Sequence, residues 1–351
     1  MSVVLSALIL MTGSFAFAGP VNPGSLSSDG YLNVYKRSAY HALERGSSLA
    51  DKQHYREALP YFKKALNDHP DSVLGWYNYA YSLMETSEDA SMSEEARQAH
   101  LEETEWAFQR AQNINPRITI TYYKLGKLAV QRNDYDSALR YYRLGVLANP
   151  ENASLRFNLG VAYEKMDKFD QALYQYQRTI LINPKFIYAY NNLGLLYEGF
   201  QEYDKAELVY KQAIKMVPTY VLPRLNLGNL LQSQDRLEEA EALYASVVKV
   251  DPHNPWGHLY LGNIAFKTGR FEEALESYNR VIEYQPDFAL PYYLSSLTLQ
   301  KLNRYDEAVA RSLQYIKLDP KGKYANEAQH LMNTLKTAQV NVEAPTTAIK
   351  H

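Results

Sequence analysis

The most regular pattern of apolar and polar positions lies in residues 187–218, and it predicts two paired helices. The apolar positions of the first helix recur at i, i+3, i+4 and i+7, on one helical face: Tyr190, Leu193, Gly194 and Tyr197. A short polar turn follows. The second helix, from about Lys205 to Met216, carries one large residue, Tyr210, between two alanines. Glycine inside a helix costs up to about 1 kcal/mol relative to alanine, so we expect a neighbouring helix to approach closely there.

The same unit recurs along the chain. Pro218 follows the second helix and ends it, because proline lacks the N–H group that a continuing helix needs. Seven such prolines stand in series, each 34 residues after the last: Pro116, Pro150, Pro184, Pro218, Pro252, Pro286 and Pro320. A small residue of the second helix keeps the same register: Ala138, Ala172, Ala206, Ala240, Ala274 and Ala308. One helix pair cannot bury both of its faces, so stacked pairs are expected.

A Leu-Gly pair in the first helix recurs as well, with its glycine at Gly126, Gly160, Gly194, Gly228 and Gly262. Together with the period of 34 and the terminal proline, this pattern resembles the tetratricopeptide repeat family. The resemblance covers about residues 39–322. It implies an all-α fold, an α-solenoid in which helix-turn-helix repeats form a right-handed superhelix.

The register of the repeats also gives an expected organisation of the chain. Residues 1–18 would be a signal peptide, 19–38 a linker with the start of the first helix, 39–322 the repeat array, 323–338 a capping helix and 339–351 a disordered tail. Eight repeats are expected, at 39–72, 73–118, 119–152, 153–186, 187–220, 221–254, 255–288 and 289–322.

The second repeat is longer than the others. Between Pro70 and Pro116 lie 46 residues instead of 34, and the extra twelve or so form an acidic insertion near Glu85 to Glu103. The segment Ser91–Glu94 is typical of a capping box, so the second helix of this repeat should start early and be long. The insertion is either a solvated loop or an acidic contact for a basic partner.

The eighth repeat departs from the pattern too. Ser312 stands where a large aromatic residue is expected, and Tyr315 stands where a small one is expected. Atypical terminal repeats are usual in such arrays. A further helix is predicted after Pro320, with one apolar face: Ala328, Leu331, Met332 and Leu335.

The N-terminal segment predicts export. An apolar run at residues 3–11 precedes Ala16-Phe17-Ala18, a pattern typical of a secretory signal peptide cleaved after Ala18, although no Lys or Arg precedes the run. The run is too short to span a membrane. The chain has no cysteine, which excludes disulfides and thiolate metal sites and suits an oxidising compartment. We therefore expect a periplasmic or secreted protein without an integral membrane span; a cytoplasmic protein is the alternative if the segment is not a signal peptide.

The family resemblance implies where partners would bind. In tetratricopeptide repeat proteins the first helices line a concave groove, and repeat positions 2, 6, 9 and 13 face into it. The candidate partner-binding residues at these positions are Asn78, Lys124, Lys127, Asn158, Tyr188, Asn192, Asn226, Asn229, Trp256, Tyr260 and Asn263. An amide offers both donors and an acceptor, so a ladder of asparagines can hold an extended peptide by its backbone. The ladder resembles that of the repeat domain of O-GlcNAc transferases, whose catalytic domain has no counterpart here.

Two readings of these positions stay open. The asparagines either contact a partner or are simply the polar residues of an exposed surface. Tyr188 and Trp256 either anchor a partner or pack against the preceding repeat. Lys124 and Lys127, with Asn158, match part of the clamp with which some relatives bind a C-terminal carboxylate, but the full pattern is absent.

No motif points to catalysis. The sequence has no Gly-rich phosphate loop, no G-x-S-x-G and no H-E-x-x-H, and His100 with Glu103 lacks a third metal ligand. A net charge of −2 gives no support for nucleic-acid binding. We expect no enzyme, cofactor or metal, but a scaffold that binds a protein or extended peptide in envelope assembly or secretion, in a larger envelope complex. The alternative is an accessory subunit of an enzyme or polysaccharide-export complex whose catalytic part is on another chain.

Overall fold

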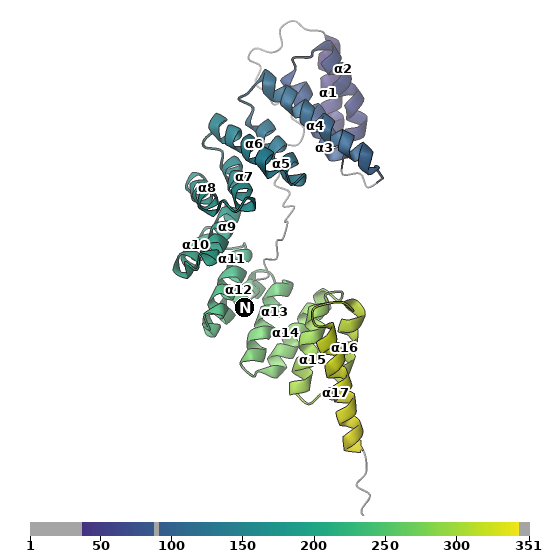
Figure 1. Ribbon diagram of the computed structural model, residues 1–351, viewed down its shortest axis with the longest axis vertical. Helices are drawn as coiled ribbons and strands as arrows, with labels where there is room; N and C mark the ends of the chain where they lie inside the picture. Colours follow the sequence, from purple (N-terminus) through teal and green to yellow (C-terminus); the bar gives the residue numbers. More distant parts are fainter. Residues whose placement is uncertain (1–36, 88–90, 344–351) are drawn as a thin grey trace, which may run out of the picture. The chain divides into compact units, whose positions relative to one another are not determined.

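The computed structural model describes residues 37–87 and 91–343, and there the chain forms seventeen α-helices and no strand. Contacts within the chain divide it into two compact units, Met1–Ile182 and Asn183–His351. Unit 1 contains α1 (Arg37–Asp51), α2 (Tyr55–Asp68), α3 (Val73–Thr86), α4 (Glu94–Ile114), α5 (Thr119–Gln131), α6 (Tyr135–Ala148), α7 (Ala153–Lys165) and α8 (Phe169–Ile182) (Figure 1). Unit 2 contains α9 (Ile187–Gly199), α10 (Tyr203–Met216), α11 (Leu222–Ser233), α12 (Leu237–Val250), α13 (Pro255–Lys267), α14 (Phe271–Tyr284), α15 (Ala289–Lys301), α16 (Tyr305–Leu318) and α17 (Ala325–Glu343).

Each helix packs against the next one in the sequence within its unit, so both units are stacks of helix pairs. This arrangement confirms the predicted all-α solenoid of paired helices. The division of the array between α8 and α9 was not predicted, because the repeat pattern continues through it. The predicted signal peptide and residues 19–36 of the predicted linker lie outside the described residues.

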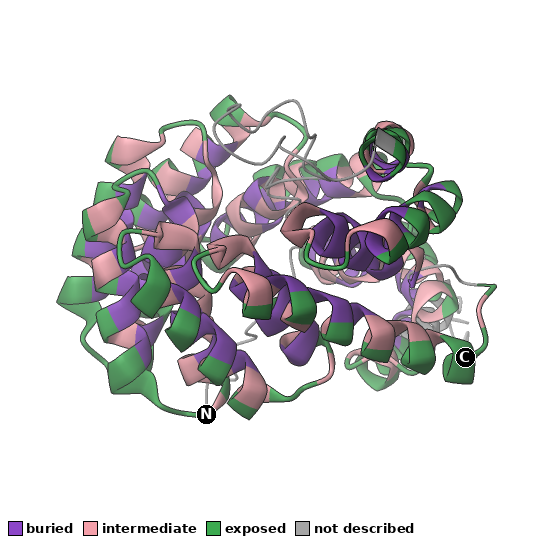
Figure 2. Cartoon of the chain, turned by 90° about the horizontal axis from the view of Figure 1, so that it is seen from above, coloured by how far each residue is buried: buried purple, intermediate pink, exposed green. Residues whose placement is uncertain are grey.

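Each helix pair is built around one ring from its second helix. The rings of six tyrosines are fully or almost fully buried: Tyr79, Tyr142, Tyr176, Tyr210, Tyr244 and Tyr278. Five of them, all but Tyr79, come from second helices, and each lies against the glycine of its first helix. A Cβ added to Gly160 would lie 2.7 Å from Cε1 of Tyr176, and one added to Gly262 would lie 2.6 Å from Cε1 of Tyr278. The predicted close approach at these glycines is therefore made by an aromatic ring. Buried residues follow the helix faces that meet such neighbours (Figure 2).

The turn between the paired helices contains one residue in the left-handed backbone conformation. The same repeat position has a positive φ, from 55° to 78°, in Asn133, Asp167, Gln201, Asp235, Gly269 and Asn303. Asparagine and aspartate tolerate this conformation better than most side chains. The residue after it then donates its N–H back to the first helix, as Asp134 does to the carbonyl of Ala129 at 2.9 Å.

The prolines that separate the repeats also take part in stacking. A side chain in the first turn of the following helix binds the proline carbonyl at 2.7–3.1 Å, in the pairs Trp76–Pro70, Arg156–Pro150, Tyr190–Pro184, His258–Pro252 and Tyr292–Pro286. At these five prolines the bond fixes the start of the next repeat, and several side-chain types can serve in this position.

The second helix of the long repeat, α4, has 21 residues, which confirms that it starts early and is long. Its N-cap is Ser93, whose Oγ accepts from the N–H of Ala96 at 3.3 Å. The N-cap therefore lies two residues beyond the predicted Ser91, and the predicted capping box does not form, because the N3 residue is Ala96. Residues 88–90 of the insertion lie outside the described residues.

In the eighth repeat the large ring has moved along the helix. Ser312 is fully buried, and Tyr315, 2 % exposed, supplies the ring from one turn further on. Ser295 and Ser296, which replace the Leu-Gly pair, satisfy their hydroxyls on carbonyls of their own helix. The eighth repeat therefore still forms a helix pair, although different residues fill the space between its two helices.

The last helix covers the end of the stack. α17 packs on α16 and buries the four predicted residues, Ala328, Leu331, Met332 and Leu335. It extends to Glu343, so the expectation of a disordered tail from residue 339 is wrong for residues 339–343. Residues 344–351 lie outside the described residues.

Candidate functional site

The predicted asparagines of unit 2 lie on three first helices, α9, α11 and α13, and are partly exposed. Asn226 Nδ2 donates to Asn191 Oδ1 at 2.5 Å, and Asn191 Nδ2 donates to Asn192 Oδ1 at 3.3 Å. These bonds link α11 to α9 by amides alone. Asn191 was not among the predicted residues. Its position directly before Asn192 in the sequence could have indicated that it belongs to the same group of amides.

The other two asparagines of unit 2 serve the packing as well. Asn229 Oδ1 accepts from the buried hydroxyl of Tyr244 at 2.7 Å, and Asn263 Oδ1 accepts from that of Tyr278 at 2.9 Å. A buried hydroxyl needs such a partner, because leaving it unpaired costs about 1–3 kcal/mol. The bonds occupy the amide oxygens and leave each Nδ2 group as a donor for another partner. Both residues therefore combine a structural role with an exposed amide.

The predicted aromatic residues are partly exposed and partly packed. The ring of Tyr188 meets that of Tyr220 edge-on at 5.8 Å, and Trp256 meets Phe288 at 5.5 Å. Tyr260 lies 6.2 Å from Trp256 and 5.0 Å from the ring of Tyr244. These contacts hold the rings in place while part of each surface stays accessible. Tyr220 and Phe288 stand at the entry to the following repeat, not the preceding one.

In unit 1 the predicted site residues are less accessible. Lys124 is only 5 % exposed, and its Nζ lies 4.4 Å above the ring of Tyr81. Burial, together with the charge of Lys127, lowers the pKa of Lys124 to about 8 against an attraction from Glu85. Lys127 itself is exposed. Lys124 is placed for packing on an aromatic ring.

The amides of Asn78 and Asn158 both donate a hydrogen bond within the protein. Asn78 is fully buried and its Nδ2 donates to Ser47 Oγ of α1 at 3.0 Å, so the prediction that it contacts a partner is wrong. Asn158 is partly exposed, but its Nδ2 donates to the carbonyl of Ser154 in its own helix at 2.7 Å. Of the predicted asparagines, the four in unit 2 and Asn158 in unit 1 are therefore partly exposed, and Asn78 is not.

The acidic residues of α4 fall into two groups. Glu94, Glu95 and Glu102, near the start of the helix, are exposed. Glu103 accepts a hydrogen bond from Tyr79 and lies 3.4 Å from Lys63, and so it joins the insertion to the core of unit 1. Only the first group is available to a basic partner.

The described residues hold neither a cluster of metal ligands nor a membrane-spanning helix. Among residues 37–87 and 91–343 no three His, Asp or Glu side chains are grouped closely enough to hold a metal ion. No helix in the same ranges combines the length and apolar character that crossing a membrane requires.

The stacked helix pairs define a repeat protein of the α-solenoid class. Three profiles described as tetratricopeptide repeat match the chain: one at 43–91, 123–185 and 162–221, a second at 199–255 and 234–299, and a third at 290–321. The chain belongs to the tetratricopeptide repeat family. A comparison with curated protein sequences gives no match.

Solved structures share the fold. Yeast Tom70 aligns with a TM-score of 0.54 and 16% identity over 90% of this chain and 68% of that one. PilW, described as a widely conserved type IV pilus biogenesis factor, aligns with a TM-score of 0.52 and 17% identity over 60% and 98%. Pseudomonas aeruginosa PilF aligns with a TM-score of 0.51 and 18% identity over 60% and 96%. At these identities the likeness concerns the fold alone, and the similarity of the asparagine ladder to O-GlcNAc transferases stays a prediction.

Proposed function

We propose that this chain is a non-enzymatic scaffold that holds an extended segment of another protein against the first helices of unit 2. The observation that carries the proposal is the amide chain Asn192–Asn191–Asn226, which joins two successive first helices: its central residue Asn191 is buried, and its two ends, Asn192 and Asn226, are partly exposed. Amides fixed by one another are pre-organised, so a peptide backbone that binds them loses less of its binding energy to ordering side chains.

Neighbouring groups extend this surface. The Nδ2 groups of Asn229 and Asn263 add donors, and the rings of Tyr188 and Trp256 add apolar area in fixed positions. Amides recognise the peptide backbone, which every polypeptide has, whereas rings accept apolar side chains. The surface should therefore select for extended conformation more than for sequence.

Binding of extended peptides should depend on the amides. Random ten-residue peptides displayed on phage and selected on the full chain should share no strict sequence motif. Their affinity should fall about tenfold in the double variant Asn192→Ala/Asn226→Ala, because each lost hydrogen bond is worth about 0.5–1.5 kcal/mol. The affinity can be measured by fluorescence anisotropy of the selected peptides.

The matched control removes two exposed amides from second helices, in Gln171→Ala/Gln212→Ala, and should bind as the unmodified chain does. Circular dichroism establishes that both double variants are folded. Equal affinities of all three proteins would contradict the proposed surface.

We also propose that the protein works outside the cytoplasm, in assembly or secretion at a cell envelope. The apolar run at residues 3–11 and the Ala16-Phe17-Ala18 site support this, and the pilus biogenesis factor PilW is one of the proteins that share the fold. N-terminal sequencing of the protein recovered from its native cells should begin at Gly19. A mature chain that starts at Met1 would contradict export.

A further inference from the structure

A second candidate surface lies in unit 1. A hollow of about 670 Å³ lies against α6, α7 and α8. We name it the basic hollow, after three of its lining residues, Arg140, Arg143 and Arg156. One acidic residue, Asp136, also lines it. Its net positive charge stands out in a chain whose net charge is −2.

The three guanidinium groups have no carboxylate partner in the described part of the chain. Arg156 donates to the carbonyl of Pro150 at 2.7 Å and to Gln175 Oε1 at 3.4 Å, which fixes its position. The guanidinium of Arg140 lies 5.1 Å from the ring centre of Tyr141, and Arg143 is exposed. Arginine presents its donors in a planar fork that matches a carboxylate. The hollow therefore offers carboxylate sites that the chain itself leaves open.

Apolar side chains accompany these charges. Leu144 and Leu147 line the hollow and are 39 % and 77 % exposed. On the neighbouring α8, Tyr174 and Leu181 are 55 % and 67 % exposed. Exposed apolar residues that gather beside charges are typical of interaction surfaces.

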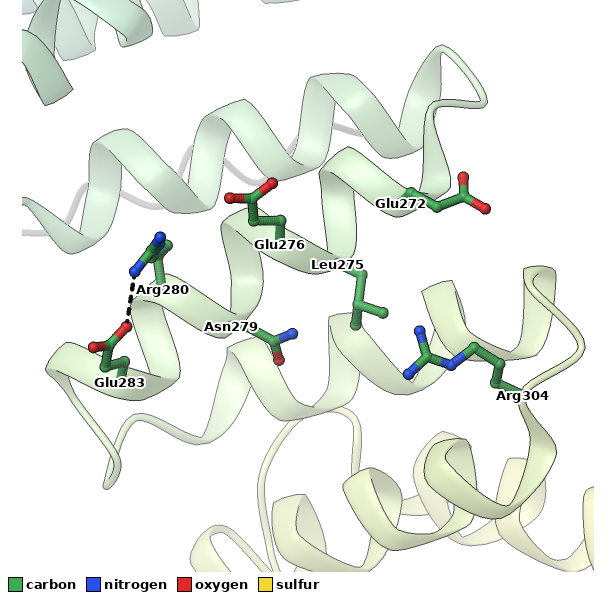
Figure 3. A pocket seen from close by; sticks show the side chains of 7 residues that line it. All are labelled: Glu272, Leu275, Glu276, Asn279, Arg280, Glu283 and Arg304. Atoms are coloured by element: carbon green, nitrogen blue, oxygen red, sulfur yellow. Dashed lines mark hydrogen bonds and ion pairs between the residues drawn. The ribbon is translucent and has the colours of Figure 1, made fainter.

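A hollow in unit 2 has an acidic lining. It measures about 330 Å³, lies against α14 and is lined by Glu272, Glu276 and Glu283 (Figure 3). Its arginines are paired, Arg280 with Glu283 at 3.2 Å and Arg304 with Glu307 at 2.7 Å. The two hollows thus differ in the charge of their lining residues: arginines without an ion pair among the described residues in unit 1, and glutamates with paired arginines in unit 2.

We propose that the basic hollow docks a short segment of a partner protein in which carboxylates stand beside leucine-like side chains. The arginines complement the carboxylates, and Leu144 and Leu147 cover the apolar part. A recessed surface accepts inserted side chains, whereas a membrane would need a protruding one. The basic hollow shares no residue with the amides of unit 2, so a variant of one site leaves the residues of the other unchanged.

The test uses a fluorescein-labelled twelve-residue peptide of alternating Glu and Leu with the full chain. We expect saturable binding by fluorescence anisotropy that weakens as salt rises, because salt screens exposed charges. Affinity should fall at least tenfold in Arg140→Glu/Arg143→Glu and clearly in Leu147→Ser. All arginine and leucine variants are compared in the Asn192→Ala/Asn226→Ala background, which weakens binding of the peptide to the amides of unit 2. In that background the matched variant Arg280→Glu should bind the peptide as its parent does.

Four outcomes would contradict the proposed docking of an acidic and apolar segment in the basic hollow. If the Glu-Leu peptide does not bind, the proposal is wrong. If a Gln-Leu peptide binds equally well, carboxylates are not what the basic hollow recognises. Equal affinity of Arg140→Glu/Arg143→Glu and its parent would place the peptide elsewhere. If the chain binds phosphatidylglycerol vesicles but not the peptide, the basic hollow contacts a membrane and not a partner protein. Leu147→Ser changes a residue that is 77 % exposed, so it tests the site even if the double variant does not fold.

Discussion

Replacing Tyr210 by alanine is expected to lower the free energy of unfolding by about 3–5 kcal/mol, the usual cost of removing a large buried aromatic side chain. The ring of Tyr210 is fully buried and fills the space over Gly194, where even one added carbon would collide with it. The loss should appear in urea unfolding followed by circular dichroism.

The variant Tyr210→Phe separates the ring from its hydroxyl. The hydroxyl donates to Glu198 Oε1 at 2.6 Å, and burial raises the pKa of Glu198 while this bond opposes the rise. Tyr210→Phe should therefore cost about 1 kcal/mol and raise the pKa of Glu198 further. A loss as large as that of Tyr210→Ala would show that the hydroxyl, and not the ring, holds the pair together.

The destabilisation caused by Tyr210→Ala should be largest in the helices nearest to the substituted residue, and hydrogen exchange can measure this. In a stack, each repeat gains stability only from its neighbours. Tyr210→Ala should therefore reduce the protection of amides in α9, α10 and α11 most, and that of α15 and α16 least. Uniform loss over unit 2 would show a more cooperative body than a solenoid is expected to be.

The features that the sequence predicted well are local ones. Gly194, Tyr210 and Pro218 lie within one repeat, and their sizes and spacing decide how the two helices meet. Because these residue types recur every 34 residues, the same helix packing is predicted for the other repeats. The four buried residues of α17 were found for the same reason, since they share one face of a single helix.

The features that it missed depend on what a neighbour contributes. Asn78 and Asn192 occupy the same repeat position, yet Asn78 is buried and bonded to Ser47 of the first helix before it. Asn226 reaches an unpredicted amide, Asn191, on the preceding first helix. A repeat register fixes the direction of a side chain on its helix, but it does not reveal which side chain of the adjoining repeat covers or meets it.

Lys124 is another residue whose setting comes from a neighbour, and replacing it by methionine is expected to stabilise the protein at pH 7 by about 2 kcal/mol. Burial first, and then Lys127, lower the pKa of Lys124 from 10.5 to about 8. That difference corresponds to about 3 kcal/mol, because each pKa unit is worth about 1.4 kcal/mol. Losing the contact of Nζ with the Tyr81 ring offsets part of the gain. The free energy of unfolding can be measured in urea.

The pH dependence identifies the cause. Between pH 8 and 10 the unfolded chain keeps the proton on Lys124 while the folded protein has released it, so the unfolded state binds more protons and stability rises with pH. Below pH 8 both states are protonated and the full cost of the buried charge is present. Above pH 10 the effect reverses, because burial raises the pKa of tyrosines such as Tyr142 and Tyr244, and unfolding releases their protons. Lys124→Met should remove the rise between pH 8 and 10, whereas the exposed-site control Lys165→Met should retain it and change stability by less than about 0.5 kcal/mol. A rise that persists in Lys124→Met would assign it to another group and leave Lys124 charged in the folded protein.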